Sequence, residues 1–417
     1  MKHLRLSAAS ELEPTPPLSA DPEFSAQVAD ILGQVRSGGD AALRRLAERF
    51  DRLEAEQPLV LDSGAMAEAC RRLNLQDRDV LRRMADRIRS FAEAQMDAAR
   101  DVGLSVDGGE AGHRWAPVER AGCYAPGGRY PLPSSVLMTV IPARVAGVAD
   151  VWLANPNPQP VTLAAAYYAG ADGVLVAGGA QAVGALAYGT ESVPAVDVIV
   201  GPGNSWVTSA KHQVSTVVKI DMLAGPSELL VVADDSAEPR VVAADLLAQA
   251  EHDVEARVGL LTTHEPLLAA VDESLTDILE TLPTRGVALE SLSRHGYAAL
   301  CTSVAEAAET SDRLAPEHLH LHLEEASKHA DSFRHYGGIF IGSEAAEVLG
   351  DYGVGPNHTL PTAQTGRFRG GLSVFDFMAC RTWLRMDDPL DVAADAERIA
   401  EMEGLAAHAL SARLRRH

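Results

Sequence analysis

The stretch Val196-Asp-Val-Ile-Val-Gly-Pro-Gly-Asn204 decides the fold class, because its short apolar run ends in a glycine-rich turn. Similar apolar runs occur at residues 151–154, 173–177 and 229–233, with helical segments between them. Runs this short, bounded by glycine, proline or asparagine, are typical of strands buried on both faces of a parallel sheet. The region from about residue 122 to 230 therefore predicts an α/β unit.

A second series of alternating strands and helices follows the first. Its apolar runs lie at residues 257–262, 298–301 and 338–342, and helical segments lie at 267–279 and near residue 305. Sheets covered by helices are the expected product of such alternation. The two series together predict two α/β domains.

The segments outside these two series have other patterns. Residues 21–99 repeat apolar side chains every three or four positions, which predicts N-terminal helices. Residues 102–112 are rich in glycine and acid, and we interpret them as a connection. The residues from about 390 onward predict a helical C-terminal tail.

The composition excludes several classes of protein. The chain has 417 residues, of which 47% are hydrophobic, enough for two or three domains with sizeable cores. A formal net charge of −22 without a basic stripe argues against nucleic acid and against an anionic membrane surface as partners. The sequence shows no segment typical of a signal peptide or a membrane span, so we expect a soluble protein.

Cysteine and histidine are used very differently in this chain. The four cysteines are far apart and form no CxxC pair. This spacing predicts neither a disulfide framework nor a thiolate zinc site, and it fits a reducing cytoplasm. The 14 histidines leave imidazole and carboxylate as the groups that could hold a metal ion.

Three glycine-rich turns, at residues 125–128, 177–181 and 200–204, follow apolar runs. There, backbone amides and the next helix N-terminus could approach a phosphate. None has the G-x-G-x-x-G pattern, although Asp197 and Asp221 lie about twenty positions beyond two of the turns, where a ribose contact is expected. Pattern alone therefore favours ordinary tight turns over a nucleotide site.

The segment from Pro239 to His252 predicts a helix that begins at its proline. Gln249 and His252 are three residues apart and so lie on one helix face. Gln249 also falls on the buried stripe, and a buried amide needs a partner. A metal or ligand is one candidate partner, but the spacing alone favours a hydrogen bond within the core.

Histidines alternate with leucine at His318, His320 and His322, which places them on one face of a predicted strand. Three imidazoles on one face could bind a metal ion. A half-solvated strand with a polar outer face explains the alternation equally well, and we favour it for His320 and His322. Glu317 and His318 follow Pro316 at a loop-to-strand junction, where an acid and a base can reach into a cleft.

Two further acid and imidazole pairs lie near the C-terminus. Asp351 and His358 belong to a glycine- and proline-rich loop, where exposed turn chemistry and a site are equally good interpretations. Glu403 and His408 fall in the predicted tail helix, five residues apart and thus on different faces. By itself the second pair is typical of a surface.

In chain order, nine short motifs resemble those of the histidinol dehydrogenase family, and the resemblance runs from about Asp21 to Arg413. The motifs are Tyr124-Ala-Pro-Gly-Gly, Gly178-Gly-Ala-Gln-Ala, Gly201-Pro-Gly-Asn, Ile220-Asp-Met-Leu-Ala-Gly-Pro-Ser-Glu, Gln249-Ala-Glu-His, Ala315-Pro-Glu-His-Leu, Gly350-Asp-Tyr, Gly355-Pro-Asn-His-Thr-Leu-Pro-Thr and Glu403-Gly-Leu-Ala-Ala-His. The resemblance implies oxidation of L-histidinol through L-histidinal to L-histidine with two NAD+ and one Zn2+ per subunit.

The resemblance also implies the roles of individual residues. His318 would be the general base, and Glu317 would activate the water that hydrates the aldehyde. The implied zinc ligands are Gln249, His252, Asp351 and His408, the last supplied by the partner subunit of a homodimer. The implied substrate contacts are Ser227, Gln249, His252, His318, Asp351, Glu403 and His408. The implied NAD contacts are Tyr124, Gln181 and Asn204.

The domain organisation implied by the family is two Rossmann-like α/β domains, one inserted in the other. Residues 20–123 and 228–372 would form the first, on the substrate and zinc side. Residues 124–227 would form the second, on the NAD side, and residues 373–417 would form a tail that reaches the partner subunit. The two linear series of strands do not predict this insertion.

Some features depart from the family's pattern and leave alternatives open. The linker at 154–160 is short, the loop at 215–220 is compressed, and Ala92 stands where a histidine is common. A paralogue that oxidises another primary alcohol, such as a sulfonated diol, fits the same residues. A zinc hydrolase would use the same imidazoles and carboxylates but would not need the turns that carry Tyr124, Gln181 and Asn204. A non-catalytic binding protein would be expected to lack Glu317 or His318.

Overall fold

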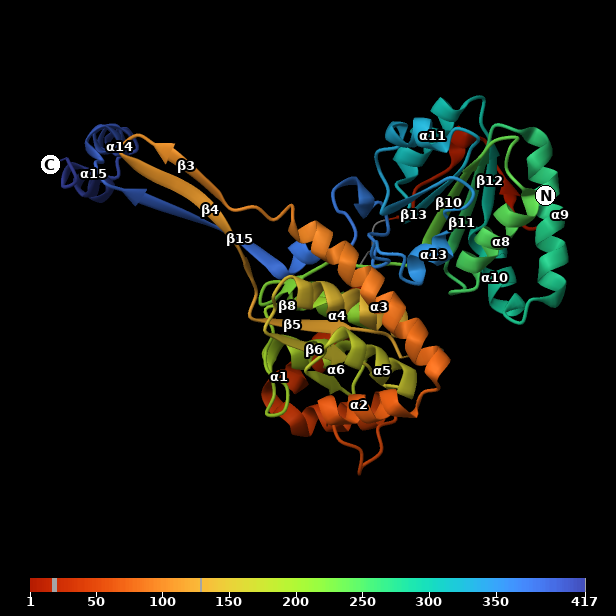
Figure 1. Cartoon of the computed structure of the whole chain (residues 1–417), viewed down its shortest axis with the longest axis horizontal. Coiled ribbons are helices and arrows are strands. Elements are labelled where there is room, and N and C mark those ends of the chain that lie inside the picture. The colour runs from red at the N-terminus through yellow and green to blue at the C-terminus, as the bar shows by residue number, and fades with distance from the viewer. Residues whose placement is uncertain (17–20, 128–129, 417) are drawn as a thin grey trace.

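The computed structural model describes residues 1–16, 21–127 and 130–416. In these residues the chain forms two six-stranded sheets covered by helices and a separate three-stranded sheet (Figure 1). This confirms the mixed α/β fold with N-terminal helices and a helical C-terminal end. Across the same ranges, no helix combines the length and apolarity needed to cross a membrane.

Sheet A is entirely parallel, in the order β1-β12-β11-β10-β13-β14. Its strands are β1 (Arg5–Leu6), β10 (Glu228–Ala233), β11 (Arg257–Thr262), β12 (Tyr297–Leu300), β13 (His318–His322) and β14 (Gly338–Ile341). The helices that follow these strands are α8 (Pro239–Ala250), α9 (Glu265–Thr281), α10 (Arg285–His295), α11 (Val304–Leu314), α12 (Ala326–His329) and α13 (Glu347–Asp351). Helices α8 to α10 pack on one face of the sheet and α11 on the other.

Sheet B has the order β2-β7-β6-β5-β8-β9, parallel except for β2. Its strands are β2 (Val60–Leu61), β5 (Arg120–Tyr124), β6 (Asp150–Ala154), β7 (Gly173–Leu175), β8 (Val198–Val200) and β9 (Lys219–Ile220). One face is covered by α2 (Ser63–Arg72), α3 (Leu75–Met96), α4 (Pro133–Val145) and α5 (Pro160–Ala169). The other is covered by α1 (Pro22–Phe50), α6 (Gly179–Tyr188) and α7 (Ser205–Val214).

The N-terminal helices pack on a different sheet from the one that the expected domain division assigned to them. Residues 20–123 were grouped with 228–372, whereas α1 to α3 pack on sheet B; for example, Val28 and Val35 share a core with Leu186. A helical pattern shows which face a helix buries but not which sheet it covers. Sheet B does lie between β1 and β10 in the chain, as an insertion requires. The boundary at residue 20, Gly128 and residue 417 lie outside the described residues.

Sheet C forms an arm that projects from the body of the molecule (Figure 1). It consists of β3 (Val102–Val106), β4 (Gly109–Pro117) and β15 (Met378–Met386), all antiparallel. The interpretation of residues 102–112 as a connection was therefore wrong. Pairing of β4 with a strand far along the chain is invisible to local pattern.

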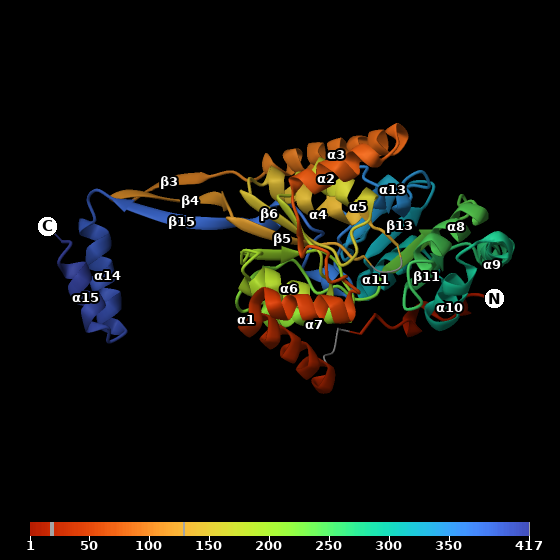
Figure 2. The ribbon, with the colours of Figure 1, turned by 90° about the horizontal axis from the view of Figure 1, so that it is seen from below.

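The predicted helical tail sits at the far end of this arm, as Figure 2 also shows. It consists of two helices packed together, α14 (Leu390–Met402) and α15 (Ala406–Arg413). Gly404 divides them because its φ of 75° lies in the left-handed region that favours glycine. The predicted helical tail is confirmed, but Glu403 and His408 flank the turn between its two helices and do not share one helix.

A short crossing joins the two large sheets. Strand β9 ends at Ile220 and β10 begins at Glu228. The carboxyl edge of sheet B therefore leads directly to the amino edge of sheet A. Side chains at these two edges are brought near each other by the connectivity.

Candidate active site

Glu317 and His318 lie at the amino end of β13, as predicted, after the left-handed residue Ala315 ends α11. The backbone of Glu228 holds both of them. Its N–H donates to Glu317 Oε2 at 2.9 Å, and its carbonyl accepts from His318 Nδ1 at 2.9 Å. Nδ1 therefore carries the proton and Nε2 the lone pair. Buried His318 Nε2 has no hydrogen-bond partner within the described part of the chain.

Burial shifts the pKa values of this acid and this base in opposite directions. Burial lowers the pKa of His318 to about 4, so the imidazole is neutral at pH 7. Burial raises the pKa of Glu317 well above its ordinary value, and the charges of Glu228 and Asp351 add to the increase. The side chain of Ser227 also hydrogen-bonds the Glu317 carboxyl. The site thus offers an unprotonated imidazole beside a carboxyl group whose raised pKa makes its ionised form a stronger base than an ordinary glutamate.

Helix α8 carries Gln249 to the same edge of sheet A. The helix follows β10 and runs back toward the amino ends of the strands, and His252 lies just beyond its last residue. Gln249 is fully buried, and its Nε2 lies 3.1 Å from His252 Nδ1. Its Oε1 finds no partner among the described residues. A core hydrogen bond therefore satisfies only half of this amide.

Asp351 and His358 lie beside these groups. Asp351 is the last residue of helix α13 rather than a loop residue, which corrects the prediction. His358 Nδ1 lies 3.1 Å from the Asp351 carbonyl, and the side chains are only 12% and 18% exposed. The charge of Asp351 opposes the effect of burial on the pKa of His318, and burial lowers the pKa of His358. The exposed-turn interpretation is wrong for both residues.

The donor set at this edge fits a zinc ion. Gln249, His252 and Asp351 offer an oxygen, a nitrogen and a carboxylate, and the unpartnered Gln249 Oε1 is a buried atom that needs a partner. Nitrogen and oxygen ligands with an open position are typical of catalytic zinc. His408 and Glu403 are exposed at the far end of the arm, away from α8 (Figure 1). Within one chain they are not brought to this site.

Tyr124, Gln181 and Asn204 gather at the carboxyl edge of sheet B. Tyr124 ends β5, Gln181 lies in the first turn of α6, and Asn204 caps α7. The Tyr124 hydroxyl accepts from Gly179 N at 3.2 Å, and Gln181 Nε2 donates to Asp51 at 2.9 Å. Ligands of parallel sheets bind at this edge.

The two aspartates considered for a ribose contact have other partners. Asp221 accepts from Gly201 N at 2.7 Å and forms a buried ion pair with Lys211. Asp197 accepts from Glu119 N and Arg120 N at 2.9 Å, at the amino end of β8. Both carboxylates stabilise backbone turns, which agrees with the ordinary tight turns that the sequence pattern favoured.

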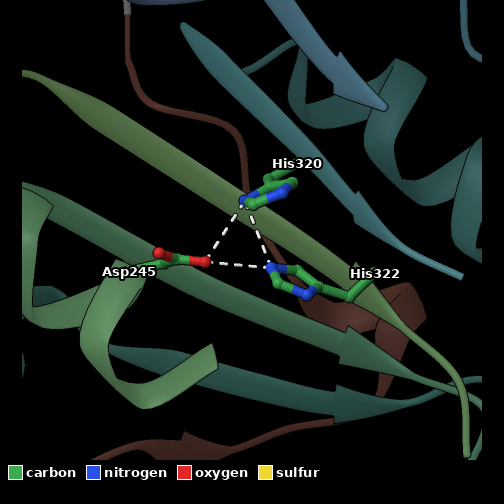
Figure 3. A group of neighbouring side chains, drawn as sticks. All are labelled: Asp245, His320 and His322. Carbon is green, nitrogen blue, oxygen red and sulfur yellow. Dashed lines mark hydrogen bonds and ion pairs between the residues drawn. The ribbon is translucent and has the colours of Figure 1, made fainter. Parts of the chain in front are cut away.

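The sequence pattern missed a buried group next to Glu317 and His318. His320 and His322 are fully buried on β13 and face Asp245 on α8 (Figure 3), so the half-solvated interpretation is wrong. Glu347 is also buried, with Oε1 3.8 Å from His318 Nδ1. Alternation signalled the shared face of the histidines, but no local pattern points to Asp245 or Glu347.

Comparisons with known proteins identify the family of this chain. The family described as histidinol dehydrogenase matches residues 16–416. The histidinol dehydrogenase of Cereibacter sphaeroides is 46% identical over 402 residues, covering 94% of this chain and 92% of that protein. That of Gluconobacter oxydans is 43% identical, covering 100% of this chain and 99% of its own.

A solved structure extends the agreement to three dimensions. The crystal structure of histidinol dehydrogenase from Elizabethkingia anophelis superposes with a TM-score of 0.92 at 32% identity, covering 99% of this chain and 98% of that one. The resemblance predicted from the nine sequence motifs is thereby confirmed. The chain belongs to the histidinol dehydrogenase family of oxidoreductases.

Proposed function

We propose that the chain oxidises L-histidinol through L-histidinal to L-histidine, using two NAD+ and one Zn2+ per subunit. The observation that carries the proposal is the neutral His318, whose unpartnered Nε2 lies at the same sheet edge as Gln249, His252 and Asp351. Family membership supports the same substrate.

Gln249, His252 and Asp351, with His408 of the partner subunit, are the proposed zinc ligands. Zinc bound there would supply Lewis-acid polarisation and hold the substrate's amine and imidazole. Tyr124, Gln181 and Asn204 are the proposed NAD contacts on the facing edge of sheet B. NAD+ would accept a hydride from the substrate carbon in each of the two oxidations.

His318 is the proposed base of the first oxidation. Its Nε2 removes the hydroxyl proton while the Glu228 carbonyl holds Nδ1–H in place. For the second oxidation, ionised Glu317 removes a proton from the water that adds to the aldehyde. The aldehyde oxygen takes up the proton that His318 received in the first oxidation, which produces the hydrate and leaves His318 neutral again. Because burial raises the pKa of Glu317, its ionised form is a strong base. His318 then serves the hydrate as it served the alcohol.

The proposal requires a homodimer in which the tail completes the partner's site. Glu403 and His408 belong to the tail at the end of the arm, far from helix α8 of their own chain (Figure 1). The arm and tail also expose large apolar side chains that a partner would cover. These include Leu104, Leu384, Ile399, Met402, Leu410 and Leu414.

The state of the cysteines supports a cytoplasmic location for this enzyme. Cys70, Cys123, Cys301 and Cys380 are all free thiols in the described part of the chain. Unpaired cysteines are typical of a reducing compartment.

Absorbance of NADH tests the proposed reaction. Purified chain with zinc is expected to form NADH from L-histidinol and to lose this activity after chelation. Turnover of a sulfonated diol without turnover of L-histidinol would contradict the proposed substrate. If no alcohol gave NADH, the dehydrogenase class itself would be contradicted, and a zinc hydrolase would be the alternative.

Mixing two inactive variants tests the shared site. His252→Ala removes a ligand from the body, and His408→Ala removes one from the tail. In a swapped dimer, the mixed species contains one intact site, so unfolding and refolding the variants together is expected to restore about a quarter of the activity. No recovery would contradict donation of His408 across the dimer.

A further inference from the structure

Asp245, His320 and His322 form a buried cluster outside the residues assigned above (Figure 3). The two histidines lie on the same face of β13 as His318, farther along the strand. Asp245 lies on α8, one turn before Gln249. Both histidines have zero exposure, and the Asp245 side chain retains 8%.

Three donor atoms of this cluster point at one another. Asp245 Oδ2 lies 2.9 Å from His322 Nε2 and 3.3 Å from His320 Nδ1, and the two nitrogens are 3.2 Å apart. Ligands of tetrahedral zinc at about 2.0–2.1 Å from the metal are separated from each other by about 3.3–3.4 Å. The triangle drawn in Figure 3 therefore has nearly the dimensions of one face of a zinc tetrahedron.

Hydrogen bonding alone does not satisfy the cluster. His320 Nε2 lies 3.1 Å from the Gly342 carbonyl, which can only accept, so this nitrogen carries a proton. In a neutral imidazole Nδ1 then presents a lone pair toward the Asp245 carboxylate, and the single hydrogen on His322 Nε2 has to serve both the carboxylate at 2.9 Å and this lone pair at 3.2 Å. His322 Nδ1 is also buried without a partner among the described residues. The centre of the triangle calls for positive charge.

We propose that Asp245, His320 and His322 bind a second divalent transition-metal ion, with zinc as the first candidate. Two imidazoles and one carboxylate match the ligand preference of zinc. Burial of both histidines makes the ion structural: it joins α8 to β13 directly behind the catalytic base. Water completes its coordination on the side where Asp245 keeps its small exposure. This site does not depend on the proposed reaction.

Metal content per subunit tests the proposal. The full-length protein is loaded with zinc, freed of excess metal and measured by inductively coupled plasma mass spectrometry. We expect two zinc equivalents in the parent protein and one in His322→Gln. His252→Ala is also expected to retain one, held by the new site. His212→Gln, which changes an exposed histidine on α7, is the matched control and is expected to retain both.

The outcomes separate the two sites. A single equivalent that is lost in His252→Ala and kept in His322→Gln would overturn the second site. A single equivalent with the opposite behaviour would support it and contradict the zinc ligands of the proposed function. Asp245→Asn provides an independent variant, with circular dichroism as the check of folding. If neither variant folds, the stoichiometry of the parent protein decides alone.

Discussion

The peptide of Glu228 orients both Glu317 and His318, because its N–H binds one and its carbonyl binds the other. A backbone group at the start of a central strand has little freedom to move. The two side chains proposed for catalysis therefore share one rigid support. Burial then lowers the pKa of the imidazole and raises that of the carboxyl group, so that two neighbouring bases differ in strength.

The pH dependence of activity follows from the His318 pKa. His318 must be neutral to accept a proton, and its pKa of about 4 lies below the ordinary 6.5. As the pH falls, the His318 imidazole stays neutral until the pH approaches its pKa. We expect the acid limb of kcat/KM for L-histidinol that belongs to His318 to lie clearly below 6.5. A limb at 6.5, in protein shown by circular dichroism to be folded, would contradict the burial argument.

Thiol reactivity provides a second prediction at the residue scale. Burial raises the pKa of Cys123 to about 12 and that of Cys301 to about 11, and Cys70 is buried as well. Only Cys380 is exposed. In native protein at pH 8 we expect a disulfide reagent to label Cys380 alone, and all four thiols after unfolding. A native Cys380→Ser variant that still reacts quickly would contradict the burial of the other three thiols.

At the scale of elements, three segments meet at the turn after β8. Gly201 has a φ of 113°, and its N–H donates to Asp221 while its carbonyl accepts from Lys211 Nζ at 3.0 Å. The buried pair of Lys211 and Asp221 thus joins α7 to the end of β9. This turn stands between the proposed NAD edge and the crossing to sheet A.

Gly201→Ala is expected to destabilise the fold. An added Cβ would lie 2.1 Å from the Tyr124 carbonyl oxygen, and the left-handed φ is itself unfavourable for alanine. The expected loss in the free energy of unfolding is about 2–4 kcal/mol, measured with urea. Gly33→Ala is the matched control, because nothing lies within 4 Å of its Cβ in helix α1. That variant should gain about 0.5–1 kcal/mol. Equal effects at both positions would contradict the steric argument.

At the scale of the whole molecule, the arm separates the tail from the body (Figure 2). Its exposed apolar side chains have no evident use in a single chain, but they suit a surface covered by a second copy. The proposed active site therefore depends on formation of the proposed dimer.

Leu410→Asp tests this connection. Leu410 on α15 is 51% exposed in the single chain. Placing a charge in a covered apolar contact should weaken the dimer at least about tenfold, so specific activity should fall on dilution. Leu75→Asp, at a residue 70% exposed on α3, is the control and should behave as the parent protein does. Activity of Leu410→Asp that is independent of concentration would contradict burial of the tail helix.

The sequence by itself determined most strands of both large sheets and the junction that carries Glu317 and His318, whereas β1, β2, β5 and β9 were not predicted. Strand and helix periods of about 2 and 3.6 residues arise from local backbone geometry, so they can be read from neighbouring residues. The resemblance of the motifs further implied Gln249, His252 and Asp351 as zinc ligands, which remains a proposal. The same resemblance implied that His408 serves the partner subunit, and no pattern predicted its position at the end of an arm.

Only the tertiary structure decided which elements meet. It placed α1 to α3 on sheet B, paired β4 with β15, and set Asp245 against His320 and His322. Each of these contacts joins segments far apart in the chain. Such contacts depend on the complementarity of two surfaces, and a local pattern shows that a surface is buried without showing what covers it.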